Sequence, residues 1–238
     1  MPNGKLYLIP TPLGPEGGHV LPEHTLAIAR SLKVFIVEKG KVSRQLLKQI
    51  GLKTPLQQCQ FFELNKFTEI REIPSFLDPA TEEGLDIGLL SDAGAPGVAD
   101  PGAQAVMAAH RKGVEVIPLV GPSAILLSLM ASGLNGQRFT FLGYLSPKRP
   151  QLAKDLKRLE KQSQQLDETQ LFIEAPYRNM GVYETAMQVL SPSTLFCIAT
   201  DLTLSTQFVR THSILEWRRL PKPNLNKRPT MFLLLGRK

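Results

Sequence analysis

The chain has 238 residues, 42% of them hydrophobic, and its 28 lysines and arginines outnumber its 21 acidic residues to give a formal charge of +7. This length can bury one large α/β core or two smaller ones, and the charge favours anionic partners such as RNA, although an ordinary basic enzyme has the same balance. Cys59 and Cys197 lie far apart and show no metal or redox spacing, so we expect both thiols to be reduced. No long apolar leader opens the sequence, so we expect a cytoplasmic protein. Pro118, Gly121 and Pro122 interrupt the most apolar window, so we expect no membrane span.

The first half of the sequence alternates apolar strands with helices. Short apolar runs bounded by turns predict strands, and apolar residues at helical spacing predict helices. The predicted elements are a strand at 6–9, a helix at 25–32, a strand at 34–37, helices at 43–50 and 66–77, a strand at 85–90, a helix at 101–112, a strand at 114–119 and a helix at 123–132. Asp100 is the candidate N-cap of the helix that Gly113 ends. This alternation is typical of a parallel α/β domain.

The pattern of small residues stops around 135–138, and we place the boundary between two domains there, 1–136 and 137–238. The elements predicted for the second half are a strand at 139–145, a helix at 150–168, a strand at 171–173, a helix at 182–190 and strands at 194–200, 208–214 and 231–235. Short connections between several of these strands favour antiparallel edges. The predicted fold class is therefore α/β, with a mostly parallel sheet in the first domain and a mixed sheet in the second.

Turns at the ends of three predicted strands indicate a ligand site in the first domain. They span residues 10–15, 91–101 and 121–124 and are rich in glycine, proline and alanine. Parallel strands bring such turns to one edge of a sheet, where small residues let a ligand approach the backbone and the next helix offers free N–H groups. The sequence has no GxGxxG, P-loop, HExxH or GxSxG motif, and its four histidines are scattered, so we assign no metal.

Taken in order, these turns and later segments resemble a known family. The segments Pro10–Gly14, Leu90–Gly102, Pro118–Ala124 and Phe172–Arg178 are similar to those of the tetrapyrrole (corrin/porphyrin) methylase superfamily. Within it, the sequence most resembles the members that methylate ribose 2′-hydroxyls of ribosomal RNA. The resemblance covers nearly the whole chain, and it implies two α/β domains, S-adenosylmethionine bound in the cleft between them, and a homodimer.

The resemblance also implies which residues bind the cofactor. It places Pro12 at the floor of the site, Ser91, Asp92, Ala93, Ser123 and Ala124 at the methionine portion, and Glu174, Ala175, Leu202 and Met231 around the adenosine. The helix that opens at Ser123 suits the methionine carboxylate, because the first N–H groups of a helix are free. The Asp92 carboxylate suits the cationic ammonium or sulfonium end.

The sequence departs from the ribosomal RNA branch at polar positions. Glu38 is followed by Lys39 where that branch has a second acid, and Arg228 and Pro229 stand where it has a glycine and a glutamate. The sequence ends at Lys238, so the resemblance implies a member without the small C-terminal extension that the branch often carries. These departures leave the cofactor turns intact and alter positions expected to face the methyl acceptor.

We take Glu38 as the candidate acid or base and Arg44 and Arg178 as candidate clamps for phosphate or carboxylate, with structural salt bridges among them as the alternative. The first functional hypothesis is methyl transfer from S-adenosylmethionine to a ribose 2′-hydroxyl of ribosomal RNA, with the small ribosomal subunit as partner. The alternatives are C-methylation of an anionic tetrapyrrole, and a protein that binds S-adenosylmethionine or RNA without catalysis.

Overall fold

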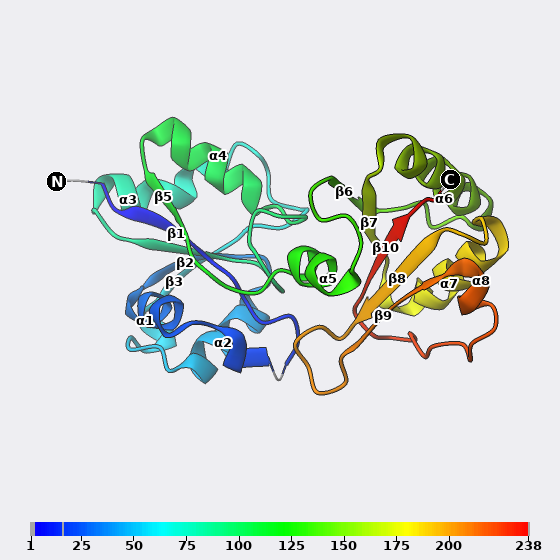
Figure 1. Ribbon diagram of the computed structural model, residues 1–238. Coiled ribbons are helices and arrows are strands. Elements are labelled where there is room, and N and C mark those ends of the chain that lie inside the picture. The colour runs from blue at the N-terminus through cyan, green and yellow to red at the C-terminus, as the bar shows by residue number, and fades with distance from the viewer. Residues whose placement is uncertain (1–2, 16, 238) are drawn as a thin grey trace. The chain divides into compact units, whose positions relative to one another are not determined.

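The computed structural model describes residues 3–15 and 17–237 and divides the chain into two compact units, Met1–Ser123 (unit 1) and Ala124–Lys238 (unit 2) (Figure 1). Helix α5 (Ala124–Ser132) belongs to unit 2, because it packs on strands of that unit and Thr211 Oγ1 donates to the carbonyl of Ser132 at 2.7 Å. The boundary expected at residue 136 would instead put this helix in the first domain. The unit to which α5 belongs is set by the strands it packs against, and the change of composition around 135–138 carries no information about that packing.

Unit 1 is built on a five-stranded sheet of order β3-β2-β4-β1-β5, with every strand parallel to its neighbours. The strands are β1 (Lys5–Ile9), β2 (Val34–Val37), β3 (Gln60–Glu63), β4 (Ile87–Leu90) and β5 (Glu115–Pro118). Ile9 and Val37 both pair with Leu90, and Val37 also pairs with Glu63. The carboxyl ends of four strands are therefore level, and the segments that follow them leave from one edge.

Helices cover both faces of the unit 1 sheet (Figure 1). Val34 and Ile36 pack with alanines of α4, whereas Phe35 and Val37 pack with Ala29 and Leu47 of the α1 and α2 helices. This alternation follows from the two-residue period of a strand. The helices are η1 (Gly17–Val20), α1 (Glu23–Ser31), α2 (Gly40–Ile50), η2 (Leu56–Gln58), η3 (Ile73–Leu77), α3 (Asp78–Glu82) and α4 (Gly102–Lys112).

Three features of unit 1 differ from the sequence predictions. The helix expected at 66–77 is a turn followed by η3, because Asn65 Oδ1 accepts from the Phe67 N–H at 3.0 Å and Pro74 interrupts the segment. Strand β3 was not expected. In addition, α4 begins at Gly102 rather than Pro101, and Asp100 is not its N-cap residue: Asp100 Oδ1 accepts from the backbone N–H groups of both Gly97 and Gly102, at 2.8 and 2.7 Å.

Unit 2 has a mixed five-stranded sheet, as the sequence predicted, of order β6-β7-β10-β8-β9. The edge strand β9 is antiparallel to its neighbour, as expected, whereas the other edge strand, β6, is parallel to β7. The remaining pairs, β7 with β10 and β10 with β8, are antiparallel. Its strands are β6 (Phe139–Tyr144), β7 (Thr169–Ile173), β8 (Leu195–Thr200), β9 (Phe208–Ser213) and β10 (Thr230–Leu235), and its other helices are α6 (Arg149–Leu166), η4 (Pro176–Arg178), α7 (Asn179–Val189) and α8 (Ile214–Trp217). Stacked Phe172, Phe232 and Phe196 form the centre of its core. Among the described residues, no helix is long and apolar enough to cross a membrane.

Gly121 lets the segment after β5 pass close to the segment after β1. A Cβ at Gly121 would lie 2.8 Å from Pro10 Cγ and closer still to Pro10 Cβ, so any side chain there displaces Pro10. Gly121→Ala should lower the free energy of unfolding by about 1–3 kcal/mol, the usual cost of overpacking. Urea unfolding followed by circular dichroism measures this change. Tryptophan fluorescence would report on unit 2, because the single tryptophan of the sequence, Trp217, lies there, whereas Gly121 lies in unit 1.

Gly18→Ala is the matched control, because nothing lies within 4 Å of a Cβ at that position. It should be neutral or slightly stabilising. Equal unfolding midpoints for the Gly121 and Gly18 variants would contradict the close approach at Pro10.

Candidate functional site

The segments after β1 and β4 are joined by backbone hydrogen bonds at the carboxyl edge of the unit 1 sheet. The Thr11 N–H donates to Gly94 O at 2.9 Å, and the Gly94 N–H donates to Thr11 O at 3.0 Å. Ser91 Oγ also donates to Gly94 O, at 3.1 Å. Gly94 has a φ of +81°, a left-handed conformation that favours glycine. This pairing fixes the position of Asp92, which lies in the tightly held turn.

Asp92 forms an ion pair with Lys39, the residue that follows Glu38 at the end of β2. Lys39 Nζ contacts Asp92 Oδ2, while Asp92 Oδ1 is buried and has no hydrogen-bond partner among the described residues. The pair raises the pKa of Lys39, mainly through its hydrogen bond to Asp92. Asp92 thus carries one neutralised oxygen and one oxygen free to accept a hydrogen bond.

Glu38 lies beside Asp92 and is partly desolvated. Glu38 Oε2 accepts a long hydrogen bond, 3.4 Å, from the Asp92 N–H. Burial and the charge of Asp92 raise the pKa of the Glu38 carboxyl, and Lys39 and the Asp92 N–H oppose that shift only in part. A carboxylate with a raised pKa is a stronger base, so Glu38 fits the role of proton acceptor that the sequence suggested.

Asp100 is the third carboxylate of this edge, and its role is structural. Burial raises its pKa, and hydrogen bonds from the Gly97 and Gly102 N–H groups oppose that rise. Its Oδ2 is buried and has no hydrogen-bond partner among the residues that the structure describes. Its other oxygen holds the turn before α4. Among the described residues, no group of three or more His, Cys, Asp or Glu side chains is arranged to hold a metal ion.

Arg44, a predicted clamp, lies on α2 on the side facing β3. Its guanidinium carbon is 4.5 Å from the centre of the Phe61 ring, a cation–π contact. The neighbouring Glu63 Oε1 accepts from the Gly40 N–H at 3.1 Å. Within the described part of the chain Arg44 makes no ion pair with Glu38, so the structure does not join these two predicted residues.

In unit 2, the residues predicted to surround the adenosine lie at one edge of the mixed sheet. Because β10 is antiparallel to β7 and β8, Met231 pairs with Ile173 and Ala199, near the carboxyl ends of those strands. Glu174 and Ala175 follow β7, and Leu202 follows β8. The structure therefore brings together Glu174, Ala175, Leu202 and Met231, whereas Ala124 opens α5.

Arg178, the other predicted clamp, is engaged within unit 2. Its Nη2 and Nε atoms donate to Glu174 Oε1 at 2.6 and 3.0 Å, and its guanidinium lies over the Tyr177 ring. Glu174 is almost fully buried and needs this partner. Arg178 is thus held in a salt bridge with Glu174, which is not one of the bridges among Glu38, Arg44 and Arg178 that were the alternative.

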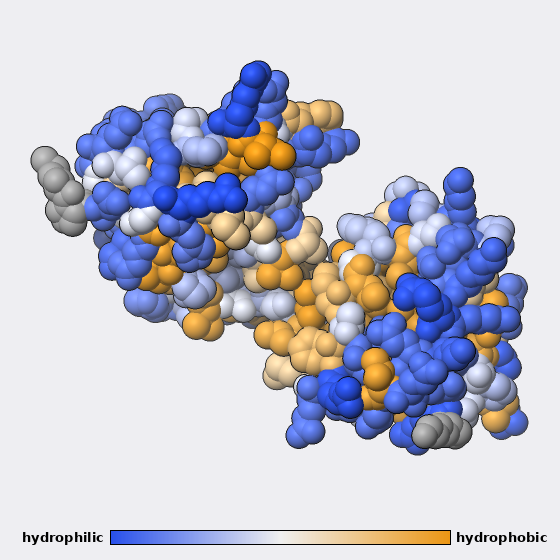
Figure 2. Space-filling view, turned by 90° about the horizontal axis from the view of Figure 1, so that it is seen from above, coloured by the Kyte–Doolittle hydropathy of each residue, from blue (hydrophilic) through white to orange (hydrophobic). Residues whose placement is uncertain are grey.

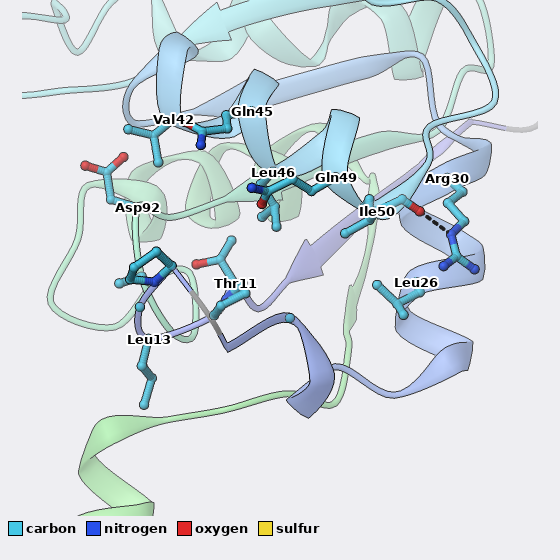
Figure 3. Close-up of a pocket in the computed structure, with 15 residues that line it drawn as sticks. Thr11, Leu13, Leu26, Arg30, Val42, Gln45, Leu46, Gln49, Ile50 and Asp92 are labelled. Atoms are coloured by element: carbon cyan, nitrogen blue, oxygen red, sulfur yellow. Dashed lines mark hydrogen bonds between the residues drawn. The ribbon is translucent and has the colours of Figure 1, made fainter. Parts of the chain in front are cut away.

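The remaining predicted cofactor residues lie in unit 1: Pro12 follows β1, Ser91, Asp92 and Ala93 follow β4, and Ser123 ends the segment after β5. Sequence reasoning identified Asp92 but missed its ion pair with Lys39. It also missed Gln45 and Gln49, which line a cavity beside this edge (Figure 3). Their spacing of four residues on a predicted helix, in step with the apolar Leu46 and Ile50, was the available signal.

No family model matches the chain. It is 31% identical over 212 residues to ribosomal RNA small subunit methyltransferase I of Vibrio cholerae, covering 88% of this chain and 69% of that protein. It is 30% identical to the protein of the same name from Thermotoga maritima, covering 87% of each.

Solved structures show the same fold. The methyltransferase CobJ matches over 98% of this chain and 94% of its own, with a TM-score of 0.62 and 19% identity. Uroporphyrin-III C-methyltransferase from Thermus thermophilus, complexed with S-adenosyl homocysteine, matches over 98% and 97%, with a TM-score of 0.54 and 16% identity.

The raised pKa of Glu38 makes the stability of the fold depend on pH. Between the pKa of unfolded glutamate, about 4.3, and the higher folded pKa, the folded state binds more protons, so stability falls as the pH rises. Glu38→Gln removes this ionisation. The variant should therefore have a larger free energy of unfolding than the parent at pH 7, and the difference should shrink toward zero as the pH falls below 4.3, about the unfolded value.

Urea unfolding at several pH values measures this difference. Glu82→Gln, an exposed site in α3, is the control and should differ little from the parent at any pH. A Glu38→Gln variant less stable than the parent at pH 7 would show that the carboxylate is stabilised by its surroundings.

Proposed function

The chain belongs to the ribosomal RNA small subunit methyltransferase I family, and we propose that it transfers the methyl group of S-adenosylmethionine to a ribose 2′-hydroxyl of ribosomal RNA. It is a methyltransferase by family and by fold. One observation supports the proposed reaction most directly. At the carboxyl edge of the unit 1 sheet, Asp92, which has a carboxylate oxygen without a partner among the described residues, lies beside the partly desolvated carboxylate of Glu38.

The Asp92 turn fits the methyl donor. When bound, S-adenosylmethionine supplies an electrophilic methyl group on a cationic sulfonium. The buried Asp92 Oδ1, which has no hydrogen-bond partner in the described part of the chain, is suited to accept from the ammonium group or to stabilise the positive charge. Ala93 is exposed and its side chain is a single methyl group, so the backbone of the turn before the buried Gly94 is open to close approach. In unit 2, Glu174, Ala175, Leu202 and Met231 remain the predicted contacts of the adenosine.

Glu38 is placed to take the proton of the acceptor. The acceptor oxygen forms a bond to the methyl carbon, the carbon–sulfur bond breaks with its electrons going to sulfur, and the hydroxyl proton must leave. Because Glu38 Oε2 accepts from the Asp92 N–H, Oε1 is the atom left to receive that proton. The raised pKa strengthens this base. Lys39, largely exposed and next in sequence, is ion-paired with Asp92, and a donor that takes its place at Asp92 would free it to contact a phosphate of the acceptor strand.

The family supports ribosomal RNA as the acceptor rather than a tetrapyrrole. CobJ and uroporphyrin-III C-methyltransferase are below 20% identical to this chain and share only the fold. The arginines that would hold the carboxylates of a tetrapyrrole are engaged elsewhere, Arg178 by Glu174 and Arg44 over Phe61. The net charge of +7 suits RNA or a whole ribosomal subunit as partner.

Transfer of labelled methyl from S-adenosylmethionine tests the reaction. We expect label in small ribosomal subunits prepared without their methylations, retained in nucleosides after digestion, and none in a uroporphyrinogen. Glu38→Gln should lower kcat by roughly 10²-fold or more, the usual worth of a general base, while calorimetry shows unchanged affinity for S-adenosylmethionine. Glu82→Gln is the control.

The outcomes separate the alternatives. Label in the tetrapyrrole alone would show that the methyl acceptor is a tetrapyrrole and not ribosomal RNA. Binding of S-adenosylmethionine without methyl transfer to the subunits or to the tetrapyrrole would favour a non-catalytic binding protein. If calorimetry shows no heat of binding at any practical protein concentration, S-adenosylmethionine is not a ligand of this chain. Full activity of Glu38→Gln would remove this residue from the mechanism.

We also propose that the chain forms a homodimer through α5. Hydrophilic residues cover most of the visible face of each unit (Figure 2), yet Leu126 and Met130, one turn apart on α5, are 54% and 78% exposed. An apolar pair on one helix face is suited to a second copy of the same surface.

Light scattering after gel filtration should give twice the monomer mass of 26.4 kDa. Met130→Glu should shift the protein toward the monomer, because it places a charge in the apolar contact. Met107→Glu, an equally non-conservative change at an exposed methionine of α4, should leave the dimer intact. A monomeric parent at tens of micromolar would contradict the proposal.

A further inference from the structure

A cavity of about 490 Å³ lies beside the carboxyl edge of the unit 1 sheet, and the proton transfer proposed above does not use it. Its walls come from the segment after β1, from α1 and α2, and from the turn after β4 (Figure 3). We call it the α2 cavity, after the helix that contributes Val42, Gln45, Leu46, Gln49 and Ile50. The volume falls in the range of small-molecule sites, about 300–1,000 Å³.

The α2 cavity is mostly apolar. Val42, Leu46 and Ile50 are spaced four apart, so they lie along one face of α2, and Leu26 of α1 contributes from another wall. In Figure 3, Leu46 and Gln49 face the segment that carries Thr11. Apolar walls of this kind hold flat rings by van der Waals contact.

Two amides supply its uncommitted polar groups. Gln45 and Gln49, also four residues apart, line the cavity and make no hydrogen bond with any residue that the structure describes. Each amide has a donor and an acceptor side by side. That arrangement matches the edge of a nucleobase, as in the pairing of glutamine with adenine.

Each charged residue among the described lining residues already has an ion-pair partner. Arg30 donates through Nη1 to Glu23 Oε1 at 2.5 Å and through Nε to Ile50 O at 2.6 Å. Asp92 is paired with Lys39. The cavity therefore suits a neutral, flat, hydrogen-bonding group, and it lacks a free cation for the several carboxylates of a tetrapyrrole.

We propose that the α2 cavity binds the base of the nucleotide that is methylated, turned out of the RNA. This inference rests on the proposed function. Pro12, Asp92 and Ala93 line the cavity and also belong to the turns assigned to the methyl donor. The Asp92 N–H contacts Glu38. A base in the cavity would therefore leave its own ribose near the donor turn and Glu38, and enzymes commonly reach atoms hidden in folded nucleic acid by extruding the nucleotide.

The double variant Gln45→Met/Gln49→Met tests the amides, since methionine keeps the length and helical preference of glutamine but lacks its hydrogen bonds. We expect kcat/KM for small ribosomal subunits to fall roughly 10- to 100-fold, the worth of one bidentate base contact. Affinity for S-adenosylmethionine, measured by calorimetry, should not change. Gln104→Met, at an exposed glutamine of α4, is the control and should retain full activity.

Leu46→Trp tests occupancy separately, because the larger ring fills the α2 cavity and leaves both amides in place. It should abolish methyl transfer to the subunits while the affinity for S-adenosylmethionine and the circular dichroism spectrum stay as in the parent. Parental kcat/KM in both the double variant and Leu46→Trp would overturn the inference and leave the proposed function standing. If the parent itself fails to methylate the subunits, the proposed function fails, and the inference fails with it.

Discussion

The site depends on the close backbone pairing between the segments that leave β1 and β4. Thr11 and Gly94 exchange both of their backbone hydrogen bonds, and Gly94 holds a positive φ, a conformation that favours glycine. Gly121 then lets the segment after β5 pass against Pro10. One constraint, the absence of side chains where three loops meet, therefore sets the position of Asp92 and of one wall of the α2 cavity.

Electrostatic balance at this edge follows from that geometry. Besides burial, the charge of Asp92 raises the pKa of both Glu38 and Asp100, and Lys39 is a cation that opposes the shift at Glu38. Sequence comparison had marked Lys39 as a departure from the family, because a second acid is usual there. In this chain the lysine partly neutralises Asp92, so a cationic ligand at Asp92 must compete with a side chain that is itself largely exposed and able to move into solvent.

The turns and most strands could be predicted from sequence because glycine and proline act locally. The segments at 10–15 and 91–101 lie where their composition placed them, at strand ends of one parallel sheet. Features that depend on contacts distant in sequence could not be predicted. Strand β3 is only four residues long and is defined by its pairing with β2, and Asn65 turns the next segment away from the helix that its spacing favoured.

The candidate site divides in the same way. Asp92 and Glu38 could be identified from motifs, whereas the Lys39–Asp92 pair, the engagement of Arg178 by Glu174 and the α2 cavity required side-chain packing. Helical spacing placed Gln45 and Gln49 on one side of a helix, but no local pattern showed that this side faces a cavity rather than solvent.

The central claim is that the turn Ser91–Ala93, held by the Thr11–Gly94 pairing, receives the amino-acid portion of the methyl donor. A crystal structure of the chain with S-adenosylhomocysteine tests this most directly. The account predicts electron density for the homocysteine portion against that turn, with Asp92 Oδ1 within hydrogen-bond distance of the ligand. Density for the ligand at any other place in unit 1, with Asp92 Oδ1 still unpartnered, would contradict it.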